Sequence, residues 1–252
     1  MRITKALPKV FIAIIITLFL NGCGSAETVT VKTAEEYFKA AVAAFDDEDW
    51  LDAIKYFDVI KLQYPASQYA DDAQFFLAEI SFRRGEYYSA AYNFATLRRI
   101  YPQSEFKKEA LFRTALSFYN LSPTYDRDQE YTKKAIQTFS EFQVLYPKDS
   151  LYDKASGFIS ELRNKLAEKY YSIARIYLNL KSIESSLIYY DAVIEEYPDT
   201  DFFEPAYFGK IEVLYTMKKY DQLRSIILLY GSLFPKSARL AQVKEIEKNL
   251  PY

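Results

Sequence analysis

The stretch Tyr64-Pro65-Ala66-Ser67-Gln68-Tyr69-Ala70-Asp71-Asp72-Ala73 decides the fold, because its pattern returns four more times along the chain. Each copy places an aromatic residue before a proline and a serine, aspartate or threonine two positions after it. Proline lacks a backbone N–H and disfavours helical geometry in the residue before it, so a helix should end here. Serine, threonine and aspartate are frequent N-cap residues, so the next helix should begin directly behind. The prolines of the five copies are Pro65, Pro102, Pro147, Pro198 and Pro235.

These prolines are separated by 37, 45, 51 and 37 residues, and no strand pattern lies between them. A period of this size is typical of a helical solenoid, in which each repeat packs only against its neighbours. The sequence therefore predicts an all-α fold of five helix pairs and a C-terminal helix within a domain at 33–252. The predicted repeats span 33–66, 67–103, 104–148, 149–199 and 200–236, and the terminal helix spans 237–250.

The third and fourth repeats are longer than the others. The extra residues of the third repeat fall in a predicted loop at 121–129. In the fourth repeat, apolar residues recur every three or four positions from Leu151 to Leu180 without a proline, which predicts one continuous helix of about 30 residues. Gly157 is the expected place for any break in it, and Gly85 is predicted to end the first helix of the second repeat.

The first 22 residues are predicted to be a signal peptide. The basic residues Arg2, Lys5 and Lys9 precede an apolar run at 10–20, which is shorter than the about 20 residues that span a bilayer. The run ends in Leu20-Asn21-Gly22-Cys23, which resembles the bacterial lipobox, and Cys23 is the only cysteine of the chain. We expect cleavage before Cys23, a covalent lipid on this residue and a polar tether at 23–32. An ordinary signal peptide with an incidental cysteine is the alternative.

Composition argues against catalysis and against nucleic acid as a partner. Without histidine, the chain has neither a Ser-His-Asp triad nor a histidine metal ligand. A formal net charge of −2 provides no basic surface for nucleic acid. The acidic pairs at 71–72 and 195–196 are interpreted as solvated helix ends, and the run at 46–49 as a turn, because it lacks the glycine of a calcium loop. We expect no enzyme activity, no metal and no cofactor besides the lipid.

The second helices share alanine, aromatic, apolar and proline positions that resemble the second half of a tetratricopeptide repeat. Two copies carry them most clearly: Ala53-Phe57-Ile60-Pro65 and Ala90-Phe94-Leu97-Pro102. The resemblance implies a right-handed superhelical solenoid with the first helix of each pair on the concave face. The last two repeats depart from the pattern, because Ser186 and Leu223 stand where alanine is usual.

Three of the first helices carry an aromatic pair seven residues apart, which places each pair on one side of its helix. The pairs occupy equivalent positions and predict a ladder of aromatic side chains across repeats one to three. One interpretation is an apolar groove that takes a peptide with aromatic side chains, with Glu79 and Arg83 as polar neighbours. The other is a set of core residues that pack repeat on repeat. The pairs are Phe38 and Phe45, Phe75 and Phe82, and Phe112 and Tyr119.

The lipobox, the five repeats and one segment of the third repeat together resemble the BamD family of outer-membrane assembly lipoproteins. The resemblance covers about residues 20–250 and implies a non-enzymatic scaffold, anchored by its lipid on the periplasmic face of the outer membrane. It implies that the C-terminal repeats bind a BamA-type barrel protein, that other lipoproteins of the assembly machine are partners, and that the N-terminal repeats read unfolded barrel precursors. The segment contains Ser122-Pro123, Asp128-Gln129, Ala135-Ile136, Phe139, Phe142 and Tyr146-Pro147.

Two other envelope functions stay open. The periplasmic tetratricopeptide coordinator of the Tol-Pal system has a similar Tyr-Pro-X-Ser turn, but it usually lacks a lipid and its repeats are more uniform. A lipoprotein scaffold for envelope polysaccharide export is the third alternative. Cys23 and the enlarged third and fourth repeats favour the BamD family. Gly24, where aspartate commonly holds a lipoprotein at the inner membrane, favours the outer membrane.

Overall fold

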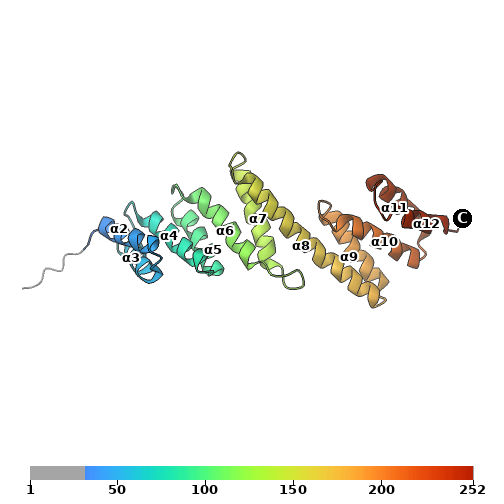
Figure 1. Cartoon of the computed structure of the whole chain (residues 1–252), viewed down its shortest axis with the longest axis horizontal. Helices are drawn as coiled ribbons and strands as arrows, with labels where there is room; N and C mark the ends of the chain where they lie inside the picture. The colour runs from blue at the N-terminus through green and yellow to red at the C-terminus, as the bar shows by residue number, and fades with distance from the viewer. Residues whose placement is uncertain (1–31, 252) are drawn as a thin grey trace, which may run out of the picture. The chain divides into compact units, whose positions relative to one another are not determined.

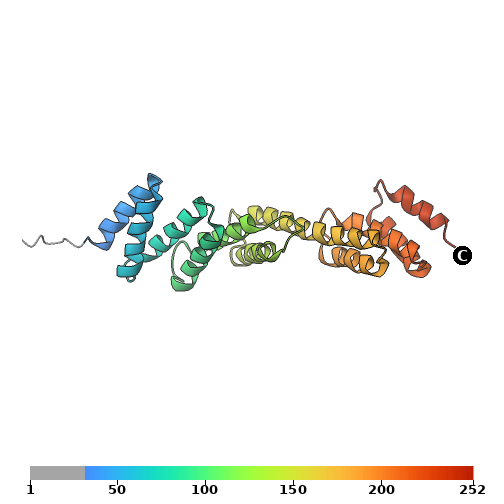
Figure 2. The ribbon, with the colours of Figure 1, turned by 90° about the horizontal axis from the view of Figure 1, so that it is seen from below.

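The computed structural model describes residues 32–251, which form eleven α-helices and no strand. These helices belong to one compact unit, Ala34–Tyr252, in which each helix packs against its neighbours in the sequence (Figure 1). Figure 2 shows the same succession of helix pairs from a second side. The predicted all-α solenoid is confirmed. The helices are α2 (Ala34–Asp46), α3 (Trp50–Gln63), α4 (Ala70–Arg83), α5 (Tyr87–Ile100), α6 (Lys107–Leu121), α7 (Glu130–Leu145), α8 (Tyr152–Asn179), α9 (Ile183–Glu196), α10 (Phe203–Thr216), α11 (Tyr220–Leu233) and α12 (Leu240–Lys248).

The five proline turns are built alike, from two successive backbone hydrogen bonds. In the first of them, the Ser67 N–H donates to the Tyr64 carbonyl at 3.0 Å, and the Ala70 N–H donates to the Ser67 carbonyl at 3.2 Å. The same two bonds recur at the other four prolines. The turn therefore satisfies the carbonyl of the residue before the proline and leads directly into the next helix.

The predicted helix starts behind these prolines are wrong by about three residues. The helices begin at Ala70, Lys107 and Tyr152 and at the equivalent later positions, five residues after each proline. The polar residue two places after the proline lies within the turn. Ser104 Oγ and Asp149 Oδ1 accept hydrogen bonds from the backbone N–H two residues further on, at 3.2 and 2.9 Å. These side chains stabilise the turn rather than cap the helix.

The turns inside four of the pairs end the first helix with a residue in the left-handed region. Gly85 occupies this position in repeat two with φ 76°, as predicted from its place in the sequence. Glu48, Lys181 and Lys218 occupy it in repeats one, four and five, with φ between 57° and 62°. In each turn the N–H of the next residue donates a hydrogen bond to a carbonyl of the first helix five residues earlier. An example is the Glu86 N–H, which donates to the Ser81 carbonyl at 2.9 Å. This is the Schellman arrangement.

Repeat three replaces the tight turn with the predicted loop, and a polar network holds this loop in place. Gln129 is buried and donates from Nε2 to the Thr124 carbonyl at 2.8 Å, while its Oε1 accepts from the Thr132 hydroxyl at 2.6 Å. Lys165 on α8 donates to Ser122 Oγ at 2.9 Å. Hydrogen bonds thus hold the loop both to its own repeat and to repeat four.

The long helix predicted in repeat four is confirmed, because α8 runs for 28 residues. The expected break at Gly157 does not occur. Gly157 lies on the exposed side of α8, and a Cβ atom there would meet nothing within 4 Å. A single glycine costs a helix about 1 kcal/mol, which the burial of apolar residues on both sides of it, such as Ala155 and Leu162, offsets.

Core positions recur at fixed distances from the proline of each repeat. Ala53, Ala90 and Ala135, at the same position of the first three second helices, have no exposed surface. Ser186 and Leu223, which replace alanine in repeats four and five, are buried to the same extent. The position is therefore part of the contact between paired helices in all five repeats, whichever residue fills it.

Candidate functional site

The six aromatic residues of the predicted ladder fall into two groups by exposure. The side chains of Phe45, Phe75 and Phe112 are buried, at 6%, 6% and 5% exposed. Phe38, Phe82 and Tyr119 are half-buried. A peptide could therefore touch only the second group without repacking of the core.

The buried group holds helices of the same and adjoining repeats together. Phe75 stacks on Phe106 with ring centroids 4.3 Å apart and meets the ring of Phe94 at 5.6 Å. Phe112 packs edge-on against Phe139 and Phe142. These three rings are packed as core residues, which was the second interpretation of the aromatic pairs.

The half-buried group also makes contacts, but each of its residues stays partly exposed. Phe38 stacks on Tyr69 at 4.8 Å. The Tyr119 ring lies 4.6 Å from that of Phe158, and its hydroxyl donates to the Glu161 carboxylate at 2.8 Å. Burial and this carboxylate raise the pKa of the Tyr119 phenol, so the phenol stays protonated and can donate. The binding role predicted for these aromatics stays a prediction.

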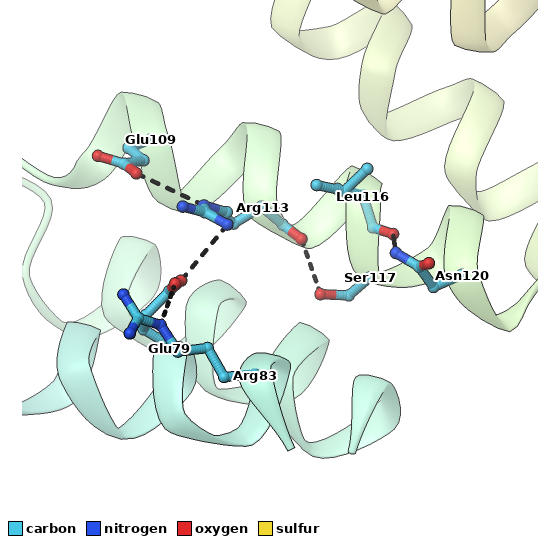
Figure 3. A network of polar contacts seen from close by, with 7 residues as sticks. All are labelled: Glu79, Arg83, Glu109, Arg113, Leu116, Ser117 and Asn120. Carbon is cyan, nitrogen blue, oxygen red and sulfur yellow. Dashed lines mark hydrogen bonds and ion pairs between the residues drawn. The ribbon is translucent and has the colours of Figure 1, made fainter. Parts of the chain in front are cut away.

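Glu79 and Arg83, the predicted polar neighbours, belong to one ionic network between α4 and α6 (Figure 3). The Glu79 side chain is 8% exposed, and its Oε1 accepts a hydrogen bond from Arg83 Nε at 3.2 Å. Its Oε2 lies 3.5 Å from Arg113 Nη1, and Arg113 Nε lies 3.5 Å from Glu109 Oε1. Two acidic and two basic side chains therefore balance their charges at this junction. A buried carboxylate is tolerated when cations neutralise it, and here two arginines do so.

Each arginine of the network also covers an aromatic ring of the ladder. The guanidinium carbon of Arg83 lies 4.6 Å from the centroid of the Phe45 ring, and that of Arg113 lies 5.4 Å from the Phe82 ring. Such cation–π contacts hold the planar guanidinium group in a fixed orientation. The Arg83 side chain is 44% exposed, and its Nη atoms make no hydrogen bond to the described residues. They are available donors for a carboxylate.

The network is confined to this junction. The positions of α6 that correspond to Glu79 and Arg83 are Leu116 and Asn120. Asn120 Nδ2 donates to the Leu116 carbonyl of its own helix at 2.8 Å and does not extend the network (Figure 3). Sequence reasoning found Glu79 and Arg83 but missed Arg113 and Glu109. Their spacing of four residues on one helix was a usable signal for a pair of this kind.

Three predictions lie outside the described residues: the lipid on Cys23, the signal peptide and the tether up to residue 31. Within residues 32–251, no helix combines the length and the apolar character that crossing a membrane requires.

Comparison with known proteins relates the chain to one family. The family described as YfiO, outer membrane lipoprotein, matches residues 30–225. The outer membrane protein assembly factor BamD of Neisseria meningitidis serogroup B is 22% identical, over 93% of this chain and 94% of the relative. The BamD protein of Vibrio cholerae serotype O1 is 23% identical, over 72% of this chain and 80% of the relative. A solved tetratricopeptide repeat protein from Parabacteroides merdae covers 85% of this chain and 73% of its own at 15% identity, with a TM-score of 0.38.

These relatives confirm the BamD-family resemblance predicted from the lipobox, the repeats and the third-repeat segment. Because the family match extends over most of the chain, this protein belongs to the YfiO family of outer membrane lipoproteins.

Proposed function

We propose that this chain is a non-enzymatic scaffold in the assembly of outer-membrane β-barrel proteins, anchored to the outer membrane by a lipid on Cys23. Support comes from its relatives in Neisseria and Vibrio, which are named outer membrane protein assembly factors and align over most of their length. A scaffold acts through surfaces, so the function depends on which side chains its helices present to partners.

The observation that carries the proposal is the arrangement of Arg83 and Arg113 around Glu79, beside the half-buried ring of Phe82. A guanidinium group with free donors binds a carboxylate strongly, and a neighbouring aromatic ring accepts an apolar side chain. The first helices of repeats two and three therefore offer both groups that would hold a peptide ending in an aromatic residue. The proposed ligand is the C-terminal segment of an unfolded barrel precursor.

The C-terminal repeats are proposed to bind a BamA-type barrel protein, with further lipoproteins of the assembly machine as additional partners. The second helix of repeat five supports a protein contact there. Three leucines on the outer side of α11, Leu228, Leu229 and Leu233, are exposed. Exposed apolar residues that gather on one face are typical of interaction surfaces.

The precursor site is tested with Arg83→Ala and a labelled peptide that ends in phenylalanine with a free carboxylate. Arg84→Ala is a matched control, because Arg84 is the next residue, is 43% exposed and, among residues 32–251, forms an ion pair only with Glu86. We expect Arg83→Ala to weaken binding about tenfold in fluorescence anisotropy, and Arg84→Ala to leave it unchanged. Amidation of the peptide should weaken binding to the native chain and have no further effect on Arg83→Ala. Equal effects of the two substitutions would place the peptide elsewhere.

A further inference from the structure

A cavity separate from the Glu79 network lies between repeats two and three, on helices α5, α6 and α7. It has a volume of about 240 Å³ and is lined by four aromatic rings, two alanines and one lysine. Two of the rings, Phe118 of α6 and Tyr131 of α7, stack with centroids 6.2 Å apart and form one wall. The lining residues are Tyr88, Ala91, Tyr92, Ala95, Phe118, Tyr131 and Lys134.

The opposite wall is formed by two tyrosines that the core does not use. Tyr88 and Tyr92 lie one helical turn apart on α5, and they are 66% and 62% exposed. No other repeat has two aromatics at this pair of positions. Counted from the prolines, the other second helices carry Leu51 and Lys55, Lys133 and Gln137, Glu184 and Ile188, and Asp221 and Ser225. The aromatic character of the cavity therefore belongs to repeat two alone and is not required by the repeat fold.

One basic side chain, Lys134, lies at the mouth of the cavity. Lys134 Nζ lies 5.4 Å from the centroid of the Tyr131 ring and 5.9 Å from that of Phe118, so its charge is held over the mouth. Its ion pair with Glu130, at 2.5 Å, joins two exposed side chains and is weak. An occupant of this cavity would gain by carrying negative charge beside an apolar group.

We propose that this cavity is a docking site for an extended segment of a partner protein that presents one aromatic side chain between acidic residues. The volume admits a single ring, which the tyrosines and Phe118 would contact on its faces and edges. A carboxylate beside that ring would pair with Lys134, the one charged residue of the lining. The site lies on side chains separate from Glu79 and Arg83, so it does not depend on the precursor site proposed above.

The experiment uses the full chain and a capped synthetic peptide with benzoylphenylalanine, a photo-crosslinking phenylalanine analogue, between two aspartates. We expect crosslinks at the residues of the cavity, and about tenfold weaker binding for Tyr92→Ala and for Lys134→Glu. Ile188→Ala removes an equally exposed apolar side chain, 66% exposed, from the same face of another second helix and should change nothing. Circular dichroism of each variant checks that the exposed substitutions leave the fold intact.

Three outcomes would overturn the proposal. Crosslinks outside the cavity would show that the peptide binds elsewhere. Equal binding of a peptide with lysines in place of the aspartates would remove the charge argument. Self-association of the chain that Tyr92→Ala abolishes, measured by sedimentation, would identify a second copy of this chain as the occupant instead.

Discussion

Repeats one and two meet through a different contact from repeats four and five, although the same two positions are involved. Phe57 of α3 stacks on Phe76 of α4, with ring centroids 5.1 Å apart and ring planes 5° apart. Counted from the prolines, the equivalent residues in repeats four and five are Tyr190 of α9 and Gly209 of α10. A Cβ atom at Gly209 would lie 2.4 Å from Cζ of Tyr190, so this ring lies against bare backbone.

The two contacts are alternative ways to fill the same space between repeats. Between repeats one and two, each helix contributes a ring. Between repeats four and five, one larger ring packs against a residue without a side chain. Repeats three and four use the first way again, because Phe139 stacks on Phe158 at 5.1 Å. At the junction of repeats two and three, the position holds Arg113 instead of a ring. The candidate site exists because this position of the junction holds a guanidinium group, which lies beside Glu79.

The largest expected effect is that of Gly209→Ala, which tests whether the contact of repeats four and five depends on bare backbone. The added methyl group would overlap the Tyr190 ring, which is almost completely buried and cannot move aside. We expect a loss of about 3 kcal/mol in the free energy of unfolding, at the upper end for overpacked cores. Urea denaturation followed by circular dichroism measures it.

Gly157→Ala is the control for that substitution. It makes the same change within a helix, but its Cβ atom would meet nothing within 4 Å. Alanine favours a helix over glycine by about 1 kcal/mol, so this variant should be more stable than the native chain. Equal stability losses in the two variants would mean that Tyr190 does not lie against Gly209.

The second prediction concerns a position of the contact between paired helices at which repeats two and five hold different residues. Ala90 has no exposed surface, whereas the same position of repeat five holds a fully buried leucine, Leu223. The helices of repeat two are therefore packed around a methyl group, and Ala90→Leu should cost about 2 kcal/mol by overpacking. Leu223→Ala should instead leave a cavity and cost at least as much. A thermal melt of Ala90→Leu that matches the native chain would show that the two pairs are packed alike.

These contrasts also mark what the sequence could predict. The proline spacing and the alanine, aromatic and apolar positions fixed the helix pairs, because those residues act through local backbone chemistry and burial. The site was only half predicted. Glu79 and Arg83 stood out beside the aromatics, but Arg113 occupies a position that is phenylalanine in two other repeats, Phe76 and Phe158, and only the meeting of α4 and α6 shows its role. No local sequence pattern indicated why residue 209 is a glycine, because the reason is the Tyr190 ring of another helix that packs against it.

A third prediction concerns the pH dependence of stability, to which repeat two contributes through a group that repeat five lacks. Burial raises the pKa of Asp72, at the start of α4, to about 6, and the neighbouring carboxylates Asp71 and Glu105 add to the shift. Repeat five has Pro205 at the equivalent position, so its junction lacks this group. Because the folded pKa lies above the ordinary value of 3.8, folding favours the protonated form. The stabilisation is complete below about pH 4 and is lost as the pH rises through about 6.

Asp72→Asn should therefore stabilise the chain at pH 7.5 by about 1 kcal/mol, reduced from the full shift because the carboxylate is partly exposed. At pH 4 the variant and the native chain should unfold at nearly the same urea concentration. Urea titrations at the two pH values measure the difference. A gain of the same size at both pH values would contradict an electrostatic origin and would point to helix propensity.

The smallest expected effect tests the turns within the pairs. Repeat two ends its first helix with Gly85 at φ 76°, whereas repeat four places Lys181 there at φ 62°. A residue with a Cβ atom pays about 1–2 kcal/mol in this conformation. Glycine avoids this strain, but its greater freedom in the unfolded chain offsets part of the gain. We expect Lys181→Gly to stabilise the chain by about 0.5 kcal/mol and Gly85→Ala to destabilise it by about 1 kcal/mol. Nothing lies within 4 Å of a Cβ atom at Gly85, so its change reports backbone strain alone. If Lys181→Gly lowers the melting temperature instead, the lysine side chain contributes a contact that outweighs the strain, and the two turns are not equivalent.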